Sequence, residues 1–292
     1  MSRLLQLPVE RQISRRRLMR AAGQWLLVSP LLGLPGCGGS SSSGSSTSTD
    51  TSTDTSTDTS TDTSTDSGTG SSSSGWATGG TSSMTATDSN PFADGLGDVC
   101  VLTEATTEGP CYSGTEMRED ISEGRDGLPL RLCFRIVDSN CEPVAGAVLD
   151  IWHCDPYGVY SGDDMQAVSF CTGGDSEYTS NNFFRGQQTS DADGLVWFSS
   201  CFPGWYSSRA VHIHFKVMVG SRTWVTSQVC FDDSLCDEIL ANEPVYSTHG
   251  EPDTHNYDDT VFPSTGYEEY LMSTTQRSDG SMLAWKALMI SA

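Results

Sequence analysis

Apolar residues occupy every second position from Leu130 to Ile136 and alternate with Arg131, Cys133 and Arg135. Side chains point alternately to the two faces of a β-strand, so this pattern predicts a strand with one buried face, and it restricts the fold more than any other feature. Similar short segments, separated by turn residues, lie at 147–153, 195–198, 210–218 and 222–231. Helical periodicity is limited to a short turn expected at 236–241. We therefore expect an all-β fold, a sandwich of short antiparallel strands joined by long loops.

Residues 38–90 differ sharply in composition from residues 91–292, which we expect to form the β-sandwich domain. Ser, Thr, Gly and Asp dominate this segment, and Thr-Ser-Thr-Asp is repeated five times within 47–66. Such a segment has little apolar surface to bury and cannot offset the entropy lost on ordering, so we expect a disordered linker. About fifty flexible residues span roughly 40 Å, enough to hold a domain clear of a membrane.

Residues 1–37 resemble an export signal. A twin-arginine motif at 14–19 precedes an apolar run at 25–34 that is too short to span a bilayer. Leu34-Pro35-Gly36-Cys37 resembles a bacterial lipobox, which would make Cys37 a lipidated residue, and a cleaved signal without lipid is the alternative. We expect an exported protein, periplasmic or on the cell surface, whose membrane contact is limited to a lipid anchor at Cys37.

The charge balance excludes one class of partner. The formal net charge is −22, and residues 91–292 carry ten basic against thirty-one acidic side chains. No basic surface is present to neutralise phosphates, so we expect no nucleic-acid partner. The sequence leaves the oligomeric state open.

Ten cysteines in an exported chain favour disulfides. If Cys37 is lipidated, nine remain, and an odd number leaves at least one free thiol. Cys230 with Cys236, and Cys171 with Cys201, are plausible pairs, although spacing alone leaves the connectivity open. A structural zinc site is disfavoured because the chain has no Cys-x-x-Cys pair.

A tyrosine, an arginine and two histidines lie within nine residues in the segment 203–215. His212 and His214 are two apart in an expected strand, so they point to the same face and can bind one metal ion. In the alternative interpretation they lie on the polar face of an amphipathic strand, and Tyr206 is a turn aromatic.

A second segment, 150–162, predicts a strand that ends in a Pro/Gly turn and delivers Tyr160. It has the sequence Asp-Ile-Trp-His-Cys-Asp-Pro-Tyr-Gly-Val-Tyr-Ser-Gly. With Phe-Phe-Arg-Gly at 183–186, Thr-Ser-Asp-Ala-Asp-Gly at 189–194 and the segment 203–215, it resembles the intradiol ring-cleavage dioxygenases. This is the family of protocatechuate 3,4-dioxygenase and catechol 1,2-dioxygenase, and the chain looks most like its single-domain exported members. Thr107-Glu108-Gly109-Pro110 and Asn256-Tyr257-Asp258-Asp259 extend the resemblance.

The resemblance implies a mononuclear non-haem Fe(III) bound by two tyrosinates and two histidines. Phenolate is a hard anionic donor, so such a set suits a trivalent ion better than a softer one. Tyr157 competes with Tyr160 for the first tyrosine position, and the Gly-x-Tyr spacing of the family favours Tyr160. The implied ligands are Tyr160, Tyr206, His212 and His214.

The same resemblance implies the reaction and its partners. A small aromatic 1,2-diol and O2 would be the substrates, and a muconate-type diacid would be the product, at a site carried by long loops. Arg209 and Tyr206 align with catalytic residues, and the fixed charge of Arg209 would stabilise a developing oxyanion; a surface or salt-bridging arginine is the alternative. Gln228 aligns with a glutamine that lines the family's site. Tyr112 and Trp205 are further candidates for substrate binding, with ordinary core packing as the alternative. Gly-Pro-Cys-Tyr at 109–112 departs from the Gly-Pro-Tyr-Tyr that is common in the family.

Other polar residues are expected to lie outside the site. His153 follows Trp152 in the strand and therefore points to the opposite face. His249 and His255 share a loop-rich stretch with Asp253, Asp258 and Asp259, which we expect to be a solvated loop, with a surface cation site as the alternative.

Two other functions compete with the dioxygenase. A transthyretin-like surface binding module would have a similar second strand and no catalysis. A cupin-like site with Fe(II) or zinc would also use His-x-His, but the chain lacks the further Glu and His at the expected places.

Overall fold

The computed structural model describes residues 75–96 and 101–292. The expected signal at 1–37, including Cys37, and most of the expected linker lie outside the described residues. No helix within the described ranges is long and apolar enough to cross a membrane.

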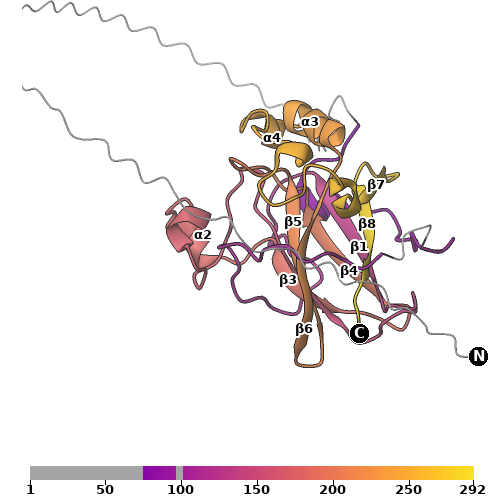
Figure 1. Cartoon of the computed structure of the whole chain (residues 1–292). Coiled ribbons are helices and arrows are strands. Elements are labelled where there is room, and N and C mark those ends of the chain that lie inside the picture. Colours follow the sequence, from indigo (N-terminus) through magenta and orange to yellow (C-terminus); the bar gives the residue numbers. More distant parts are fainter. Residues whose placement is uncertain (1–74, 97–100) are drawn as a thin grey trace, which may run out of the picture. The chain divides into compact units, whose positions relative to one another are not determined.

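Strands dominate the described chain and form two four-stranded sheets (Figure 1). In the first sheet the order is β4 (Leu195–Cys201), β1 (Pro129–Val137), β8 (Met282–Met289) and β7 (Ser273–Gln276). In the second sheet the order is β3 (Arg185–Thr189), β2 (Val148–Trp152), β5 (His212–Val219) and β6 (Arg222–Cys230). The β-rich class is therefore confirmed.

Both sheets contribute to one apolar core, and the alternation in β1 is the reason. Leu132 and Phe134 are fully buried within it, together with Ile151 of β2 and Phe215 of β5. The rings of Phe134 and Phe215 lie 6.5 Å apart, one from each sheet. The period of two in each strand thus directs its apolar face toward the other sheet.

The expectation of purely antiparallel pairing is wrong for one pair. β1 pairs with β8 in parallel, in register from Leu130 opposite Met282 to Val137 opposite Met289. A parallel neighbour requires a long connection, and the chain between β1 and β8 contains six other strands and four helices. β3, β7 and β8 were not predicted, because none of them alternates apolar with polar residues: β3 is Arg-Gly-Gln-Gln-Thr, β7 is Ser-Thr-Thr-Gln, and β8 is apolar at nearly every position.

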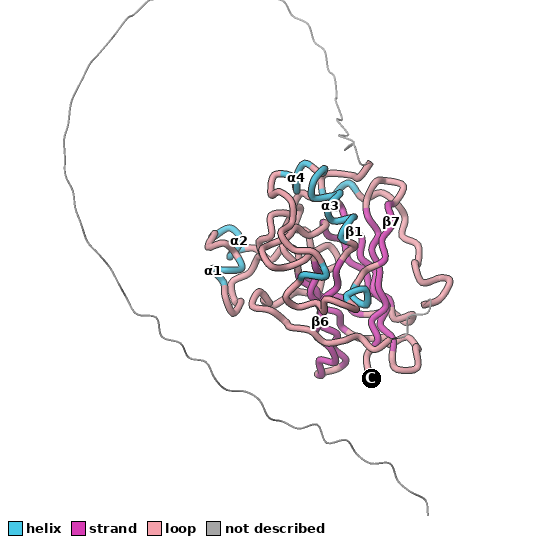
Figure 2. The backbone as a smooth tube through the Cα atoms, turned by 45° about the horizontal axis from the view of Figure 1, so that its top comes forward, coloured by secondary structure: helices cyan, strands magenta, loops and turns pink. Residues whose placement is uncertain are grey.

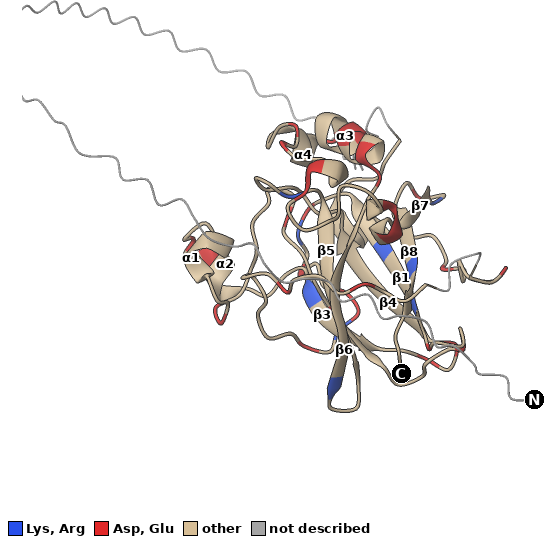
Figure 3. Cartoon of the chain, viewed as in Figure 1, with Lys and Arg blue, Asp and Glu red and all other residues tan. Residues whose placement is uncertain are grey.

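The helices are short and lie outside the two sheets (Figure 2). The expected helical turn at 236–241 is part of a ten-residue helix, α3 (Asp233–Asn242), whose first turn is capped by the carboxylate of Asp232. Acidic residues cluster on α3 (Figure 3), while Ile239 and Leu240 pack into the core. The other helical elements are α1 (Val168–Cys171), α2 (Ser176–Ser180), α4 (Pro244–Ser247), η1 (Gly80–Ser83), η2 (Asn256–Asp258) and η3 (Tyr267–Tyr270).

Residues 75–90, which composition assigns to the linker, contact the domain expected at 91–292. Trp76 is buried in the main core, and the amide of Gly80 donates to the carbonyl of Gly127 at 3.0 Å. Asp88 forms ion pairs with Arg131 at 2.7 Å and Arg277 at 2.9 Å. The Ser/Thr-rich composition of residues 38–90 did not indicate that Trp76 packs into the core.

Neither proposed cysteine pair forms. Within the described residues, a disulfide joins Cys111 to Cys171. Cys141 is also disulfide-bonded. Cys201, Cys230 and Cys236 are buried free thiols. The reason is packing, because Cys230 and Cys236 face different apolar clusters, and so do Cys171 and Cys201.

Candidate metal centre

The segments that carry Tyr160 and Tyr206 pack backbone against backbone, and two glycines allow this. Gly158 has a φ of +80°, and a Cβ atom there would lie 2.1 Å from the carbonyl oxygen that precedes Tyr206. A Cβ atom on Gly204 would lie 2.3 Å from the carbonyl oxygen of Pro156. Only glycine fits at such approaches. The turn glycines therefore bring together two tyrosines that are 46 residues apart.

β5 presents His212 and His214 on one face, and both side chains are buried. Their Nε2 atoms lie 3.1 Å apart. The Nδ1 atom of His212 donates to the carbonyl oxygen of Ala210 at 2.6 Å, so its Nε2 atom carries a lone pair. Trp152 of β2 stacks on the His214 ring, with centroids 5.0 Å apart and an interplanar angle of 11°. Neighbouring elements thus hold both imidazoles in place.

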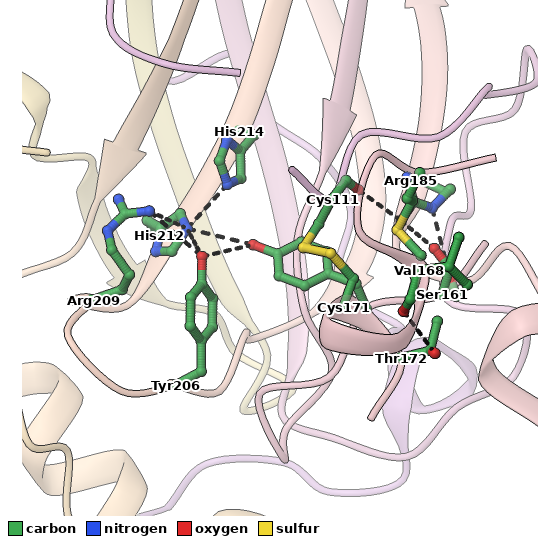
Figure 4. The surroundings of a disulfide bond; sticks show 12 residues. Cys111, Ser161, Val168, Cys171, Thr172, Arg185, Tyr206, Arg209, His212 and His214 are labelled. Atoms are coloured by element: carbon green, nitrogen blue, oxygen red, sulfur yellow. Dashed lines mark hydrogen bonds between the residues drawn. A yellow bond between two sulfur atoms is a disulfide. The ribbon is translucent and has the colours of Figure 1, made fainter. Parts of the chain in front are cut away.

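The hydroxyls of the two tyrosines meet these imidazoles. The Oη atom of Tyr206 lies 3.1 Å from Nε2 of His212 and 3.5 Å from Oη of Tyr160. The Oη atom of Tyr160 lies 3.4 Å from Nε2 of His212. Figure 4 shows Tyr206, His212 and His214 pointing toward one another. Donors at these separations can share one ion at the usual bond length of about 2.0–2.2 Å.

Burial decides the protonation of the four groups. It holds the pKa of His212 and of His214 well below 6.5, so both imidazoles are neutral and able to bind metal. Burial also raises the pKa of Tyr160 well above 10 and raises that of Tyr206, while the Arg209 charge opposes both increases. Only a nearby cation would make these phenols anionic at neutral pH. Two potential phenolates and two neutral imidazoles fit a hard, highly charged ion.

The tyrosines are essential to this donor set. Across residues 75–96 and 101–292, no group of three His, Cys, Asp or Glu side chains is placed to bind a metal ion. The site therefore differs in composition from a zinc site of Cys and His or from a carboxylate site.

Arg209 lies at the edge of the donor cluster. Its Nη1 atom is 3.4 Å from Oη of Tyr206 and 3.3 Å from Nε2 of His212. Its Nε atom donates to Oδ2 of Asp259 at 2.9 Å, and its Nη2 atom donates to Oε1 of Gln228. The guanidinium is thus held on two sides with one edge toward the donors.

The comparisons with known proteins agree with this geometry. The family model described as Dioxygenase matches residues 107–256, which include all four donors and Arg209. A solved structure, the intradiol ring-cleavage dioxygenase from Tetranychus urticae, is 27% identical with a TM-score of 0.57 and covers 65% of this chain and 94% of that one. The chain belongs to the intradiol ring-cleavage dioxygenase family.

Two curated relatives of this dioxygenase-family chain have catechol substrates in their names. Catechol 1,2-dioxygenase 1 of Acinetobacter lwoffii is 26% identical over 209 residues, which cover 63% of this chain and 57% of the relative. Chlorocatechol 1,2-dioxygenase of Pseudomonas sp. strain P51 is 28% identical over 132 residues, which cover 37% and 48%. The chain spans about half the length of the curated relatives it matches.

The three predicted substrate-binding residues of this family member differ in what they contact. Tyr112 donates to Oδ2 of Asp150 at 2.9 Å and packs edge-on against Trp152. The indole of Trp205 donates to the carbonyl of Gly250 at 3.0 Å. Gln228 supports Arg209 and donates to the carbonyl of Thr107 at 2.9 Å. The structure therefore brings Gln228 next to the cluster and directs Tyr112 and Trp205 to other partners.

The other candidate residues named from the sequence lie outside the donor cluster. Tyr157 is 46% exposed, whereas Tyr160 is 2% exposed and lies in the cluster. His153 bonds to the backbone of Cys154 and to Ser200, on the side of the strand away from His214. His249 bonds to the carbonyl oxygen of Trp205, and His255 pairs with Asp237 at 3.0 Å.

The expectation of a solvated loop is wrong for Asp259. Its side chain is fully buried, and Oδ2 accepts from Arg209 and from the amide of Ala210 at 2.7 Å. Oδ1 accepts from the amides of Val261 and Phe262 at 2.7 and 2.9 Å. Only its place in the Asn-Tyr-Asp-Asp motif could have drawn attention to it, because the contact with Arg209 spans fifty residues.

A cavity of about 140 Å³ adjoins both tyrosines. Its lining is Cys111, Gly158, Tyr160, Phe170, Cys171, Tyr206 and Ser207. A larger cavity, about 530 Å³, is lined by residues of β6, β8 and η3 but by none of the four donors. We assign the chemistry to the smaller cavity because it alone of the two is lined by donor residues, Tyr160 and Tyr206.

We expect Asp259→Asn to destabilise the protein by about 2 kcal/mol and to lower turnover about tenfold. All four hydrogen bonds to Asp259 need acceptor oxygens, and an amide would present N–H groups to one pair of donors. Urea unfolding and oxygen uptake would measure these effects. Asp258→Asn, at the exposed neighbouring position, is the matched control and should change neither. Equal effects in the two variants would contradict the role of Asp259.

Proposed function

We propose that this protein is an Fe(III)-dependent intradiol dioxygenase that cleaves a catecholic ring between its two hydroxyl-bearing carbons. Its second substrate would be O2, and its product a muconate-type diacid. The observation that carries the proposal is the meeting of two phenols and two imidazoles, with adjacent contacts of 3.1–3.5 Å, beside a cavity. The catechol substrates named for two relatives support the substrate class.

Tyr160, Tyr206, His212 and His214 would hold the iron. The bound Fe(III) would supply the Lewis acidity that favours the deprotonated diol and its reaction with O2.

The two tyrosines have different surroundings and therefore different roles. Both line the cavity, but Tyr160 is almost fully buried and packs in an apolar cluster with Trp152, Cys154 and Met165. Tyr206 is only half-buried. The Oη atom of Tyr206, as a phenolate, can accept a proton from a substrate hydroxyl at the cavity wall.

Arg209 supplies a fixed positive charge next to Tyr206. A guanidinium stays protonated at any physiological pH, so it can stabilise negative charge that develops on the substrate oxygens. Asp259 and Gln228 orient it before the substrate binds, so little reorganisation is needed.

A non-catalytic binding module explains these contacts poorly. Burying four polar side chains around one point costs free energy unless a ligand or ion is bound there, and a surface-binding module gains nothing from it.

Iron content, colour and oxygen uptake together test the proposal. Protein purified after iron-replete expression should contain about one iron per chain and be reddish, because tyrosinate-to-Fe(III) charge transfer absorbs visible light. It should consume about one O2 per catechol, consistent with incorporation of both oxygen atoms. Zinc-loaded protein is the control and should be colourless and inactive. Colourless protein with stoichiometric zinc, or without metal after iron-replete expression, would contradict the proposal.

A further inference from the structure

The cavity beside the tyrosines contains no charged group. In the described part of the chain its wall consists of two tyrosines, a glycine, a serine, a phenylalanine and the disulfide formed by Cys111 and Cys171. A substrate carboxylate entering this cavity would lose water without gaining a cationic partner, which is costly. The net charge of −22 adds long-range repulsion of anions.

Neither nearby arginine belongs to the cavity wall. Arg209 pairs with Asp259 and directs its free edge to the donor cluster, so it can serve the ring oxygens but does not line the cavity that a ring substituent would enter. Arg185 is fully buried, with its guanidinium on the carbonyl oxygens of Ser161 and Cys111 (Figure 4). It lies behind the cavity wall and is inaccessible to a bound ring.

Phe170 provides the main apolar surface of the cavity that remains open to solvent. It lines the cavity, yet 70% of its surface is exposed, more than for any other large apolar residue within the described ranges. An apolar group that covered part of this ring would be stabilised by the apolar area removed from water.

The position of Phe170 is tied to that of Tyr160. A four-residue helix such as α1 has little stability by itself. The Cys111–Cys171 disulfide anchors its last residue, and the amide of Tyr160 donates to the carbonyl oxygen of Cys171 at 2.8 Å. The amide of Ala167 donates to the carbonyl oxygen of Pro110 at 3.4 Å. Phe170 is thus held at a constant place relative to Tyr160.

We propose that this cavity selects uncharged catechols that carry an apolar ring substituent, with Phe170 and the Cys111–Cys171 disulfide as the residues that determine this preference. The inference rests on the proposed function, because it concerns the same site. It narrows the substrates to catechols whose substituent contacts Phe170 and excludes ring carboxylates.

Three substrates and three variants test this selection. Catechol, 4-tert-butylcatechol and protocatechuate would be compared by kcat/KM from oxygen uptake and by Kd from anaerobic calorimetry. Wild-type enzyme should prefer tert-butylcatechol over protocatechuate by about a hundredfold. Phe170→Ala should lower kcat/KM for tert-butylcatechol about fivefold to tenfold and change that for catechol less than about twofold. Tyr257→Ala, at an exposed aromatic that does not line the cavity, is the matched control and should change nothing.

Phe170→Arg is expected to increase kcat/KM for one substrate, protocatechuate, and a misfolded protein would not show such an increase. It places a cation at the cavity wall and should raise kcat/KM for protocatechuate relative to catechol about tenfold. If protocatechuate is used as well as tert-butylcatechol by the wild type, or if Phe170→Ala affects all substrates equally, this inference is overturned while the proposed function stands. If no catechol binds and the protein lacks iron, the proposed function fails and this inference fails with it.

Discussion

Tyr160→Phe should weaken and shift the iron-dependent colour, to which Tyr206 also contributes, and lower turnover of catechol on the order of 10³-fold. Tyr160 is 2% exposed and its Oη atom lies 3.4 Å from Nε2 of His212, so the substitution removes an anionic donor from the centre of the site. Phenylalanine keeps the ring that packs against Trp152 and the Cys111–Cys171 disulfide, so the fold should persist. Visible absorption, iron content and oxygen uptake measure the effect, and circular dichroism checks the fold.

Tyr157→Phe is the matched control. Tyr157 lies three residues earlier in the same turn but is 46% exposed and does not line the cavity. This variant should keep the iron, the colour and the activity. An unchanged visible band together with full iron content in Tyr160→Phe, or equal losses in both variants, would show that Tyr160 is not a ligand.

Gly158→Ala should cause the second large loss. A methyl group there would lie 2.1 Å from the carbonyl oxygen of Trp205 and 3.2 Å from Cβ of Tyr206, so the segment that carries Tyr206 must move. The φ of +80° adds about 1–2 kcal/mol of backbone strain. Because a displacement of about 1 Å can cost 10²-fold in rate, we expect at least that loss of turnover, together with reduced iron content.

Gly220→Ala separates backbone strain from the clash. Gly220 lies between β5 and β6 with a φ of +61°, and a Cβ atom there would meet nothing within 4 Å. Its variant should lose about 1 kcal/mol of stability in urea and keep its iron and activity. If Gly158→Ala kept wild-type iron content, or if both variants lost the same activity, close packing of the two tyrosine segments would not be needed for function.

Much of the architecture could be predicted from local pattern. β1, β2, β4, β5 and β6 carry apolar residues at a period of two or in short runs, because each buries a face against the other sheet. β3 and β7 carry no such pattern, and they are defined by hydrogen bonding to the backbones of β2 and β8. The parallel placement of β8 depends on a connection of more than one hundred residues, which no short window of sequence describes.

Part of the candidate site could also be predicted from local sequence pattern. The spacing of His212 and His214 determined that they share a face, since residues two apart in a strand always do. The Pro/Gly turn before Tyr160 and the resemblance to the dioxygenase family pointed to the two tyrosines. The sequence by itself therefore determined the donor types and the β-class of the fold.

Only the tertiary structure decided which residues surround the donors. It paired Arg209 with Asp259, placed Phe170 and the Cys111–Cys171 disulfide at the cavity, and directed Tyr112 to Asp150. These contacts join residues 38 to 60 positions apart or lie on loops. Local patterns report which face of one strand is buried, but the identity of the partner across the core depends on how all the elements pack.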